Sequence, residues 1–227
     1  MSHFPCIDPL AERFAWVSPY NYAENEPIGH VDLWGLQKVI FDNKAASNQA
    51  FLTAYFIVER TPAGEQFIEA LETQEDIDIL FFEIPYGVSG KTFGVIRSFD
   101  HFKSLLRKEP ELAAAFSGRE EEYKRFFSDG KMLIFIGVNC EDECSYDNLL
   151  DIADTIVHEL DAHALNDLKG VSKSALEEHA DYFGIDKKEA SIYSPDAEEV
   201  DESPRYKKSK AKKNLDDIKK ILDDEEY

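Results

Sequence analysis

Hydrophobic side chains recur at helical spacing in two neighbouring stretches. Over residues 47–60 the large apolar side chains form one broad face, which predicts an amphipathic helix. A second helix is expected from Pro62 to about Thr73. Thr61 is a suitable N-cap for it, proline is favoured at the first helical position, and Glu65 lies near the place of a capping-box acid.

Three later stretches have the apolar content of strands. Residues 77–84 and 92–97 flank a glycine-containing turn, so we expect them to pair as a hairpin. Residues 131–139 form the most continuous apolar run, which favours a central strand. Between the strands, residues 99–127 have polar-faced helical patterns that are broken at Pro110. Helices and strands in this order predict an α+β fold.

A further amphipathic helix is expected from Tyr146, with Ser145 as its N-cap. Gly170 is placed to end it as the C′ residue, and another helix is expected to start near Ser172. The apolar positions of the first helix repeat three and four residues apart, at Leu149, Ile152, Ala153 and Ile156.

The candidate chemistry lies at the end of that helix, in the run His158-Glu159-Leu160-Asp161-Ala162-His163. Zinc hydrolases commonly carry H-E-x-x-H on a helix, where two histidines one turn apart bind the ion and the glutamate is the general base. Here the second histidine comes one residue later. Positions i and i+5 of a regular helix lie about 140° apart, so both rings cannot reach one ion. A π-bulge absorbs one extra residue and would return both histidines to one face. A shared metal site therefore requires a π-bulge.

Other arrangements of the same residues are open. Three of the chain's six histidines, His158, His163 and His179, fall in this region. Glu159 and His163 are four residues apart and can share an ion without a bulge, together with His179, although no general base would then remain. Without a metal, Glu159 and His163 would form an ordinary side-chain pair on an acidic helix.

The segment from Glu177 to Gly184 resembles the third-ligand helix of gluzincin metallopeptidases, E-x-x-A-[DN]-x-F-[AG]. The spacing H-E-x-x-x-H also occurs in the dipeptidyl peptidase III enzymes. The resemblance implies a Zn²⁺ cofactor with His158, His163 and Glu177 as metal ligands. It also implies Glu159 as the catalytic residue, activating a zinc-bound water. From the residues alone, His179 is the alternative ligand.

Composition limits the partners. The chain has 227 residues and a formal net charge of −21, which argues against nonspecific binding to nucleic acid because phosphates attract positive surfaces. A negative charge of this size would attract a basic partner by long-range electrostatics, and it also increases solubility. No apolar run has the length of a membrane span, and the N-terminus lacks the pattern of a signal peptide. We therefore expect synthesis in the bacterial cytoplasm, with export, if any, by a dedicated secretion system.

The cysteines are few. Cys140 and Cys144 form a C-x₃-C pair after the third strand, and no second pair completes a zinc site. We expect both to be ordinary thiols, with a disulfide as the alternative. Cys6 has no expected partner.

Residues 8–36 resemble the end of the Rhs repeat-associated core. They read DPLAE, then SPYNYAENEPI, then DLWGL, and the family typically reads D-P-L-A-E, S-P-Y-x-Y-x-x-N-x-P-[IV] and D-P-x-G-L. Leu33 replaces the proline of the last motif. The family core cleaves itself after the final leucine, and we do not expect this chain to do so.

The Rhs resemblance implies a polymorphic toxin after the core, delivered into a competing cell and neutralised by a cognate immunity protein. The chain then divides into residues 1–36, a core remnant with short β and turn structure; residues 37–185, the toxin domain; and residues 186–227, a charged and largely disordered tail. A short docking helix near residues 215–222 is the alternative for the end of this tail.

The combined hypothesis is a zincin-like α+β metallopeptidase domain, with a small sheet packed on the metal-bearing helices, that hydrolyses a protein of the recipient cell. A non-catalytic or degenerate orphan toxin that binds an immunity partner is the second hypothesis. A metal-dependent nuclease using Asp154, His158 and Asp161 is the third.

Overall fold

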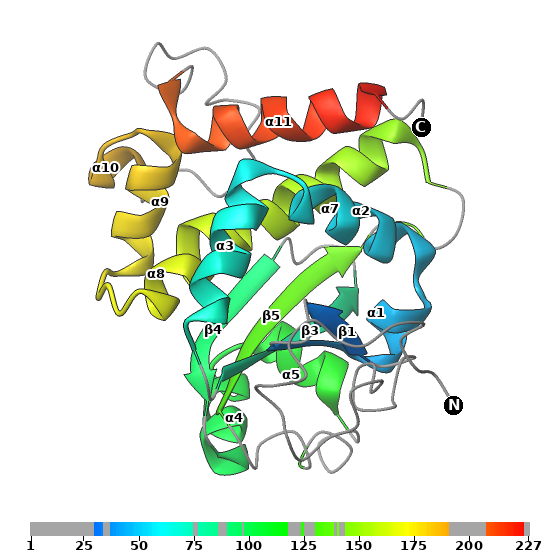
Figure 1. The fold of residues 1–227 in the computed structure, drawn as a ribbon. Helices are drawn as coiled ribbons and strands as arrows, with labels where there is room; N and C mark the ends of the chain where they lie inside the picture. The colour runs from blue at the N-terminus through cyan, green and yellow to red at the C-terminus, as the bar shows by residue number, and fades with distance from the viewer. Residues whose placement is uncertain are drawn as a thin grey trace.

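The chain folds around one mixed β-sheet with helices on both faces (Figure 1). The computed structural model describes residues 30–33, 37–74, 77–85, 90–96, 98–117, 124, 130–138, 140, 144–190 and 208–224. Most of the Rhs-like segment, including residues 8–29, therefore lies outside the described residues. The α+β prediction is confirmed.

The sheet has five strands in the order β1-β2-β3-β5-β4. They are β1 (His30–Leu33), β2 (Gln37–Phe41), β3 (Ile77–Pro85), β4 (Gly90–Ile96) and β5 (Gly130–Val138). β2, β3 and β5 run parallel, whereas β1 and β4 are antiparallel to their neighbours. The predicted hairpin of β3 with β4 is wrong, because β5 lies between them and pairs with both along most of its length. β5 is an internal strand, as its apolar run predicted.

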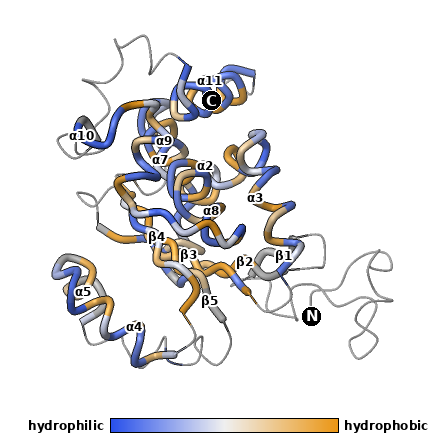
Figure 2. The backbone as a smooth tube through the Cα atoms, turned by 90° about the vertical axis from the view of Figure 1, so that its left-hand side faces the viewer, coloured by the Kyte–Doolittle hydropathy of each residue, from blue (hydrophilic) through white to orange (hydrophobic). Residues whose placement is uncertain are grey.

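Alternating side chains of the strands feed two separate cores. On β3, Ile79 and Phe81 belong to the larger core, and Leu80 and Phe82 belong to the smaller one. This alternation is the two-residue period of a strand with both faces covered. The strands are accordingly among the most hydrophobic parts of the chain in Figure 2.

The helices divide between the two faces. α2, α3 and α7 cover the larger core, whereas α4 and α5 cover the smaller core on the opposite face (Figure 1). The bounds of the helices before β5 are α1 (Asn43–Ser47), α2 (Gln49–Glu59), α3 (Pro62–Glu72), α4 (Phe99–Leu106) and α5 (Pro110–Phe116). After β5 come α7 (Tyr146–His158), the π-helical segment η4 (Glu159–Ala164), α8 (Leu165–Leu168), α9 (Ala175–Phe183), α10 (Lys187–Ala190) and α11 (Lys210–Asp224).

The predicted N-terminal caps of the helices are largely confirmed. The Thr61 hydroxyl accepts a hydrogen bond from the backbone N–H of Gly64, with Pro62 in the first helical turn, and Ser145 caps α7. Gly170 has φ +65, the left-handed conformation that a helix C′ residue commonly adopts.

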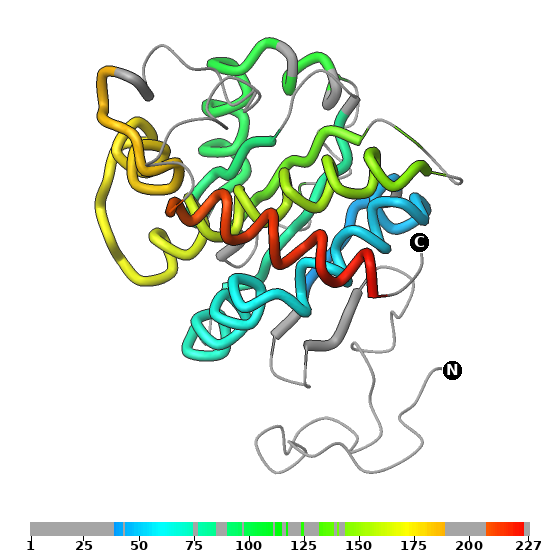
Figure 3. Tube along the Cα trace, turned by 90° about the horizontal axis from the view of Figure 1, so that it is seen from above, coloured from blue at the N-terminus to red at the C-terminus, as the bar shows by residue number. Residues whose placement is uncertain are grey.

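The prediction of a disordered tail is wrong for residues 210–224, which form α11, so the alternative of a helix near residues 215–222 is the one that the structure shows. This helix crosses the outside of the helical layer, over α7 (Figure 3). Ile218 and Leu222 are 0% exposed and belong to the larger core. The reason is visible in the periodicity: the buried residues Ala211, Asn214, Ile218 and Leu222 lie three or four positions apart, so a mostly charged helix still has one face to bury.

Cys140 and Cys144 are joined in a disulfide, with Cα atoms 5.9 Å apart, so the expectation of two free thiols is wrong. A separation of this size is within the ordinary range for a disulfide. No helix in the described part of the chain is long and apolar enough to cross a membrane.

Candidate metal centre

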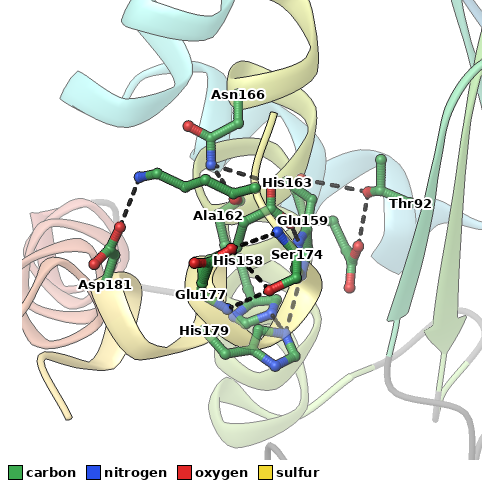
Figure 4. Close-up of polar contacts among 12 residues, drawn as sticks. Thr92, His158, Glu159, Ala162, His163, Asn166, Ser174, Glu177, His179 and Asp181 are labelled. Atoms are coloured by element: carbon green, nitrogen blue, oxygen red, sulfur yellow. Dashed lines mark hydrogen bonds and ion pairs between the residues drawn. The ribbon is translucent and has the colours of Figure 1, made fainter. Parts of the chain in front are cut away.

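The candidate metal-binding motif lies on one continuous helix made of α7, η4 and α8, which we call the metal helix. Hydrogen bonding widens to the π pattern over Glu159–Ala164 and returns to the α pattern at Leu165. The π-bulge that the H-E-x-x-x-H spacing required is therefore present at the motif itself. Both histidines of the motif lie on the side of this helix that faces α9 (Figure 4).

Three imidazole nitrogens converge at this point. The Nε2 of His179 lies 3.3 Å from the Nε2 of His158 and 3.0 Å from the Nε2 of His163. One ligand atom from each residue lies within 4.8 Å of the others, and among the described residues this is the cluster that can hold a metal ion. Three nitrogens bound tetrahedrally to zinc at about 2.0–2.1 Å would lie about 3.3 Å apart. The two distances from the Nε2 of His179 are therefore close to those that a zinc ion requires.

A buried carboxylate fixes the orientation of His163. The Nδ1 of His163 lies 2.7 Å from Oε2 of Glu178. The side-chain amide of Asn166 donates a hydrogen bond of 3.3 Å to the other carboxylate oxygen of Glu178. With a carboxylate on Nδ1, the proton of the neutral ring stays on Nδ1 and the lone pair is on Nε2, which points into the cluster. This is the arrangement that metal-ligating histidines usually have.

Glu177, the third ligand implied by the gluzincin resemblance, lies elsewhere. Its carboxylate accepts hydrogen bonds from the backbone N–H and hydroxyl of Ser174 in a capping box, and it forms an ion pair with Lys187. Lys187 and Ser174 lower its pKa to about 2. Successive residues of a helix point about 100° apart, so Glu178 and His179 face the metal helix while Glu177 caps its own helix.

The predicted general base, Glu159, faces the edge strand β4. Its Oε2 accepts a hydrogen bond of 2.7 Å from the Thr92 hydroxyl, as Figure 4 shows. The residue is only 4% exposed. Burial raises the pKa of its carboxyl, and the nearby His163 and the bond from Thr92 oppose this shift.

Two glycines let β4 approach the metal helix closely. A Cβ at Gly90 would lie 2.7 Å from Oε1 of Glu159, and a Cβ at Gly94 would lie 2.7 Å from Oδ2 of Asp167. Gly90, Thr92 and Gly94 alternate along the strand, so they share its face toward the helix. The register of β4 with β5 shifts between Phe93 and Ile96, next to this contact.

Burial favours the neutral form of two of the imidazoles, those of His158 and His179. Desolvation, followed by the charges of His163 and His179, lowers the pKa of His158 well below its usual value. Desolvation and His163 lower the pKa of His179 to about 4. A neutral imidazole has the free lone pair that a metal ion requires, so these two rings are ready to bind an ion at neutral pH.

The residues of the nuclease hypothesis are not brought together. The side chain of Asp161 points to α11, where its oxygens contact Lys210 and Asn214. Asp154 lies one turn before His158, and burial, together with Asp151, raises its pKa to about 6. Neither residue is part of the three-histidine cluster.

The rival arrangement, in which Glu159 and His163 bind an ion without a bulge, has the required His179 in place. Glu159, however, is held by Thr92 and lies outside the cluster. Sequence reasoning missed Glu178 and Thr92 altogether. Glu178 is next to His179 in the chain, but nothing in the spacing distinguishes it from its neighbour Glu177.

Comparisons of the chain with protein-family models, with curated proteins and with solved structures found no match.

Proposed function

We propose that this chain is a zinc-dependent peptidase-type effector domain. The observation that carries the proposal is the convergence of three Nε2 atoms across a π-helical segment, with an acidic residue directly after the first histidine. Three imidazoles form a donor set that suits zinc, and three protein ligands are typical of a catalytic rather than a structural zinc site.

His158, His163 and His179 would hold the ion, and Glu178 would keep His163 in the tautomer that binds it. When bound, zinc supplies Lewis acidity and brings the pKa of water toward neutrality.

Glu159 is the proton carrier in this proposal. Thr92 holds Oε2, which leaves Oε1 as the oxygen that takes a proton from the attacking water and returns it to the leaving amine. The raised pKa of this buried carboxyl supports the role, because a general base works best when its pKa is near the operating pH.

Strand β4 supports a polypeptide substrate. Within the described part of the chain it is an edge strand of the sheet, lies beside η4 and pairs with β5 alone. An extended peptide can add to such an edge through main-chain hydrogen bonds. The peptide would then lie next to the strand that contacts Glu159.

The resemblance of residues 8–36 to the Rhs core supports a role in competition between bacteria. On this proposal the substrate is a protein of the recipient cell, and a cognate immunity protein protects the producer. The formal net charge of −21 supports a basic surface on that immunity protein.

One observation favours a second candidate, a metal-binding module without hydrolytic activity. Glu159 is buried and engaged by Thr92, and a Cβ at Gly90 would already clash with it, so the base is enclosed by β4.

Elemental analysis and a cleavage assay test the proposal together. The full chain should bind about one zinc per molecule, and it should release new α-amino groups from a random peptide library. The variant Glu159→Gln should keep the zinc and lose the cleavage, since the amide cannot accept the proton. Zinc without cleavage in the wild type would favour the second candidate. Cleavage of DNA or RNA but not peptides would favour the nuclease.

A further inference from the structure

The π-helical segment carries a buried acidic residue whose partners come from the far end of the chain. Asp161 lies between the two histidines of the motif. Its Oδ1 lies 3.0 Å from Nζ of Lys210, and its Oδ2 accepts a hydrogen bond of 3.0 Å from the side-chain amide of Asn214. Both partners belong to α11, so each oxygen of a carboxylate that is 8% exposed is matched by this one helix.

Asn214 also connects α11 to the other side of the metal centre. Its side-chain amide lies 3.5 Å from the hydroxyl of Tyr182, which is buried on α9. The ring of Tyr182 packs edge-on against the ring of His158, with centroids 4.7 Å apart. One buried amide therefore contacts Asp161 on the π segment and, through Tyr182, the surroundings of the first ligand.

The direction in which Asp161 points depends on the helical register. Six residues in π geometry rotate less per residue than six in α geometry, so a change of register would turn Asp161 away from α11 and separate His158 from His163. A buried carboxylate that loses its partners is strongly unfavourable, because its charge is then uncompensated. The contacts of Asp161 with α11 thus disfavour the register that would open the histidine cluster.

We infer that α11 is a positioning element of the metal centre: Lys210 and Asn214 hold the π register through Asp161. This inference rests on the proposed metal site, and it assigns a role to a helix that contributes no ligand.

Zinc affinity of the full-length chain, measured by competition with a chromophoric chelator, tests the inference. We expect Asn214→Ala to weaken zinc binding about 10-fold, within the range known for residues that support ligands indirectly. Lys210→Gln should weaken it in the same direction and less, since the Lys210 side chain is 58% exposed. The matched control is Lys212→Gln, because Lys212 pairs with Asp216 within α11 and makes no hydrogen bond or ion pair with η4 among the described residues.

A second readout separates positioning from general stability. Co²⁺ in place of zinc has a visible absorption spectrum that reports the geometry of its ligands. This spectrum should change in Asn214→Ala and stay unchanged in Lys212→Gln. Deleting Ala162 removes the extra residue of the bulge and should restore an α-helical H-E-x-x-H. In that background Asn214→Ala should no longer weaken zinc binding.

The outcomes distinguish the two proposals. If the wild type binds zinc and both α11 variants bind it as tightly, the positioning role is wrong and the metal centre stands. If the weakening persists unchanged in the Ala162 deletion, α11 supports the fold and not the register, and the inference fails. If the wild type binds no zinc, the metal centre and the inference fail together. Should Asn214→Ala not fold, Lys210→Gln at its exposed position provides the same comparison.

Discussion

The two consecutive parts of the metal helix, α7 and η4, have opposite characters. α7 is a regular helix whose fully buried residues are all apolar, from Leu149 to Val157, whereas its Asp154 and His158 are partly buried. η4 follows without a break, has π geometry, and buries Glu159 and Asp161 beside its apolar residues. A helix that needed only to cover a sheet would have no reason to bury two carboxylates, because each needs dedicated partners.

The partners of the two parts differ in the same way. α7 packs against the larger core through apolar side chains such as Ile156. These contacts require side chains of complementary shape but no particular polar partner. Each polar group of η4 has an assigned partner on another element: Thr92 for Glu159, Glu178 for His163, and α11 for Asp161. Most of the core packing thus belongs to α7, and the candidate chemistry belongs to η4 and to His158 at the end of α7, so the two can be perturbed separately.

The largest effect is expected from removing a histidine ligand. Replacing His158, His163 or His179 by alanine should abolish stoichiometric zinc binding, because two neutral imidazoles alone make a weak site. Elemental analysis after gel filtration measures this directly. Circular dichroism of the same samples should show that the helices remain, and zinc retained in all three variants would contradict the site.

A change in α7 should have the converse effect. Ile156 is 0% exposed, so Ile156→Ala should lower the free energy of unfolding by about 2–5 kcal/mol, as expected for a truncated core side chain. The folded fraction should still bind zinc in the wild-type ratio. Urea unfolding followed by zinc analysis tests both points, and Val171→Ala, at an exposed position, is the control. Loss of zinc from folded Ile156→Ala would remove the distinction between the two parts.

A pH-dependent effect on stability is expected from Asp154, which lies on α7. Its pKa is raised from 3.8 to about 6, so the folded protein binds this proton more tightly than the unfolded chain. The stability that protonated Asp154 contributes is therefore lost as the pH rises from about 4 through about 6. The free energy of unfolding of Asp154→Asn, measured relative to the wild type, should therefore increase from pH 4 to pH 7, by at most about 3 kcal/mol. Unfolding curves of both proteins at pH 4 and pH 7 measure this change. A stability difference between them that does not depend on pH would show that burial does not raise the pKa of Asp154.

The smallest effect is expected at Glu177. Because this side chain caps α9 and pairs with Lys187, Glu177→Ala should slightly lower the melting temperature and leave zinc binding unchanged. Zinc titration beside Glu178→Ala makes the comparison between adjacent residues, since Glu178→Ala should weaken binding about 10–100-fold. Equal losses in the two variants would mean that the gluzincin-like ligand set is used after all.

The sequence predicted features that depend on neighbouring residues. The caps at Thr61 and Ser145, the C′ glycine at residue 170 and the π-bulge all follow from spacing within one helix, and each is present. The bulge is what an ion shared by His158 and His163 would require, and its presence brings the two side chains to one face of the helix. That they bind an ion stays a prediction.

Features that depend on distant segments were not predictable in the same way. The hairpin of β3 with β4 failed because β5, about 35 residues after β4, inserts between them. The C-terminal helix was underestimated because its buried stripe is stabilised by packing against distant elements, chiefly α7 and α9. At the site, Thr92 reaches Glu159 from a strand 67 residues earlier, and no local pattern in the sequence indicates such a contact.

The disulfide between Cys140 and Cys144 has a consequence for where the protein is stable. It links the end of β5 to the residue before the N-cap of α7, so the start of the metal helix is covalently tied to the sheet. Closing so short a loop contributes about 2 kcal/mol by the chain-entropy model. That contribution exists in oxidising surroundings and disappears where glutathione and thioredoxin keep thiols reduced. The same chain would thus be more stable outside a cell than in the cytoplasm.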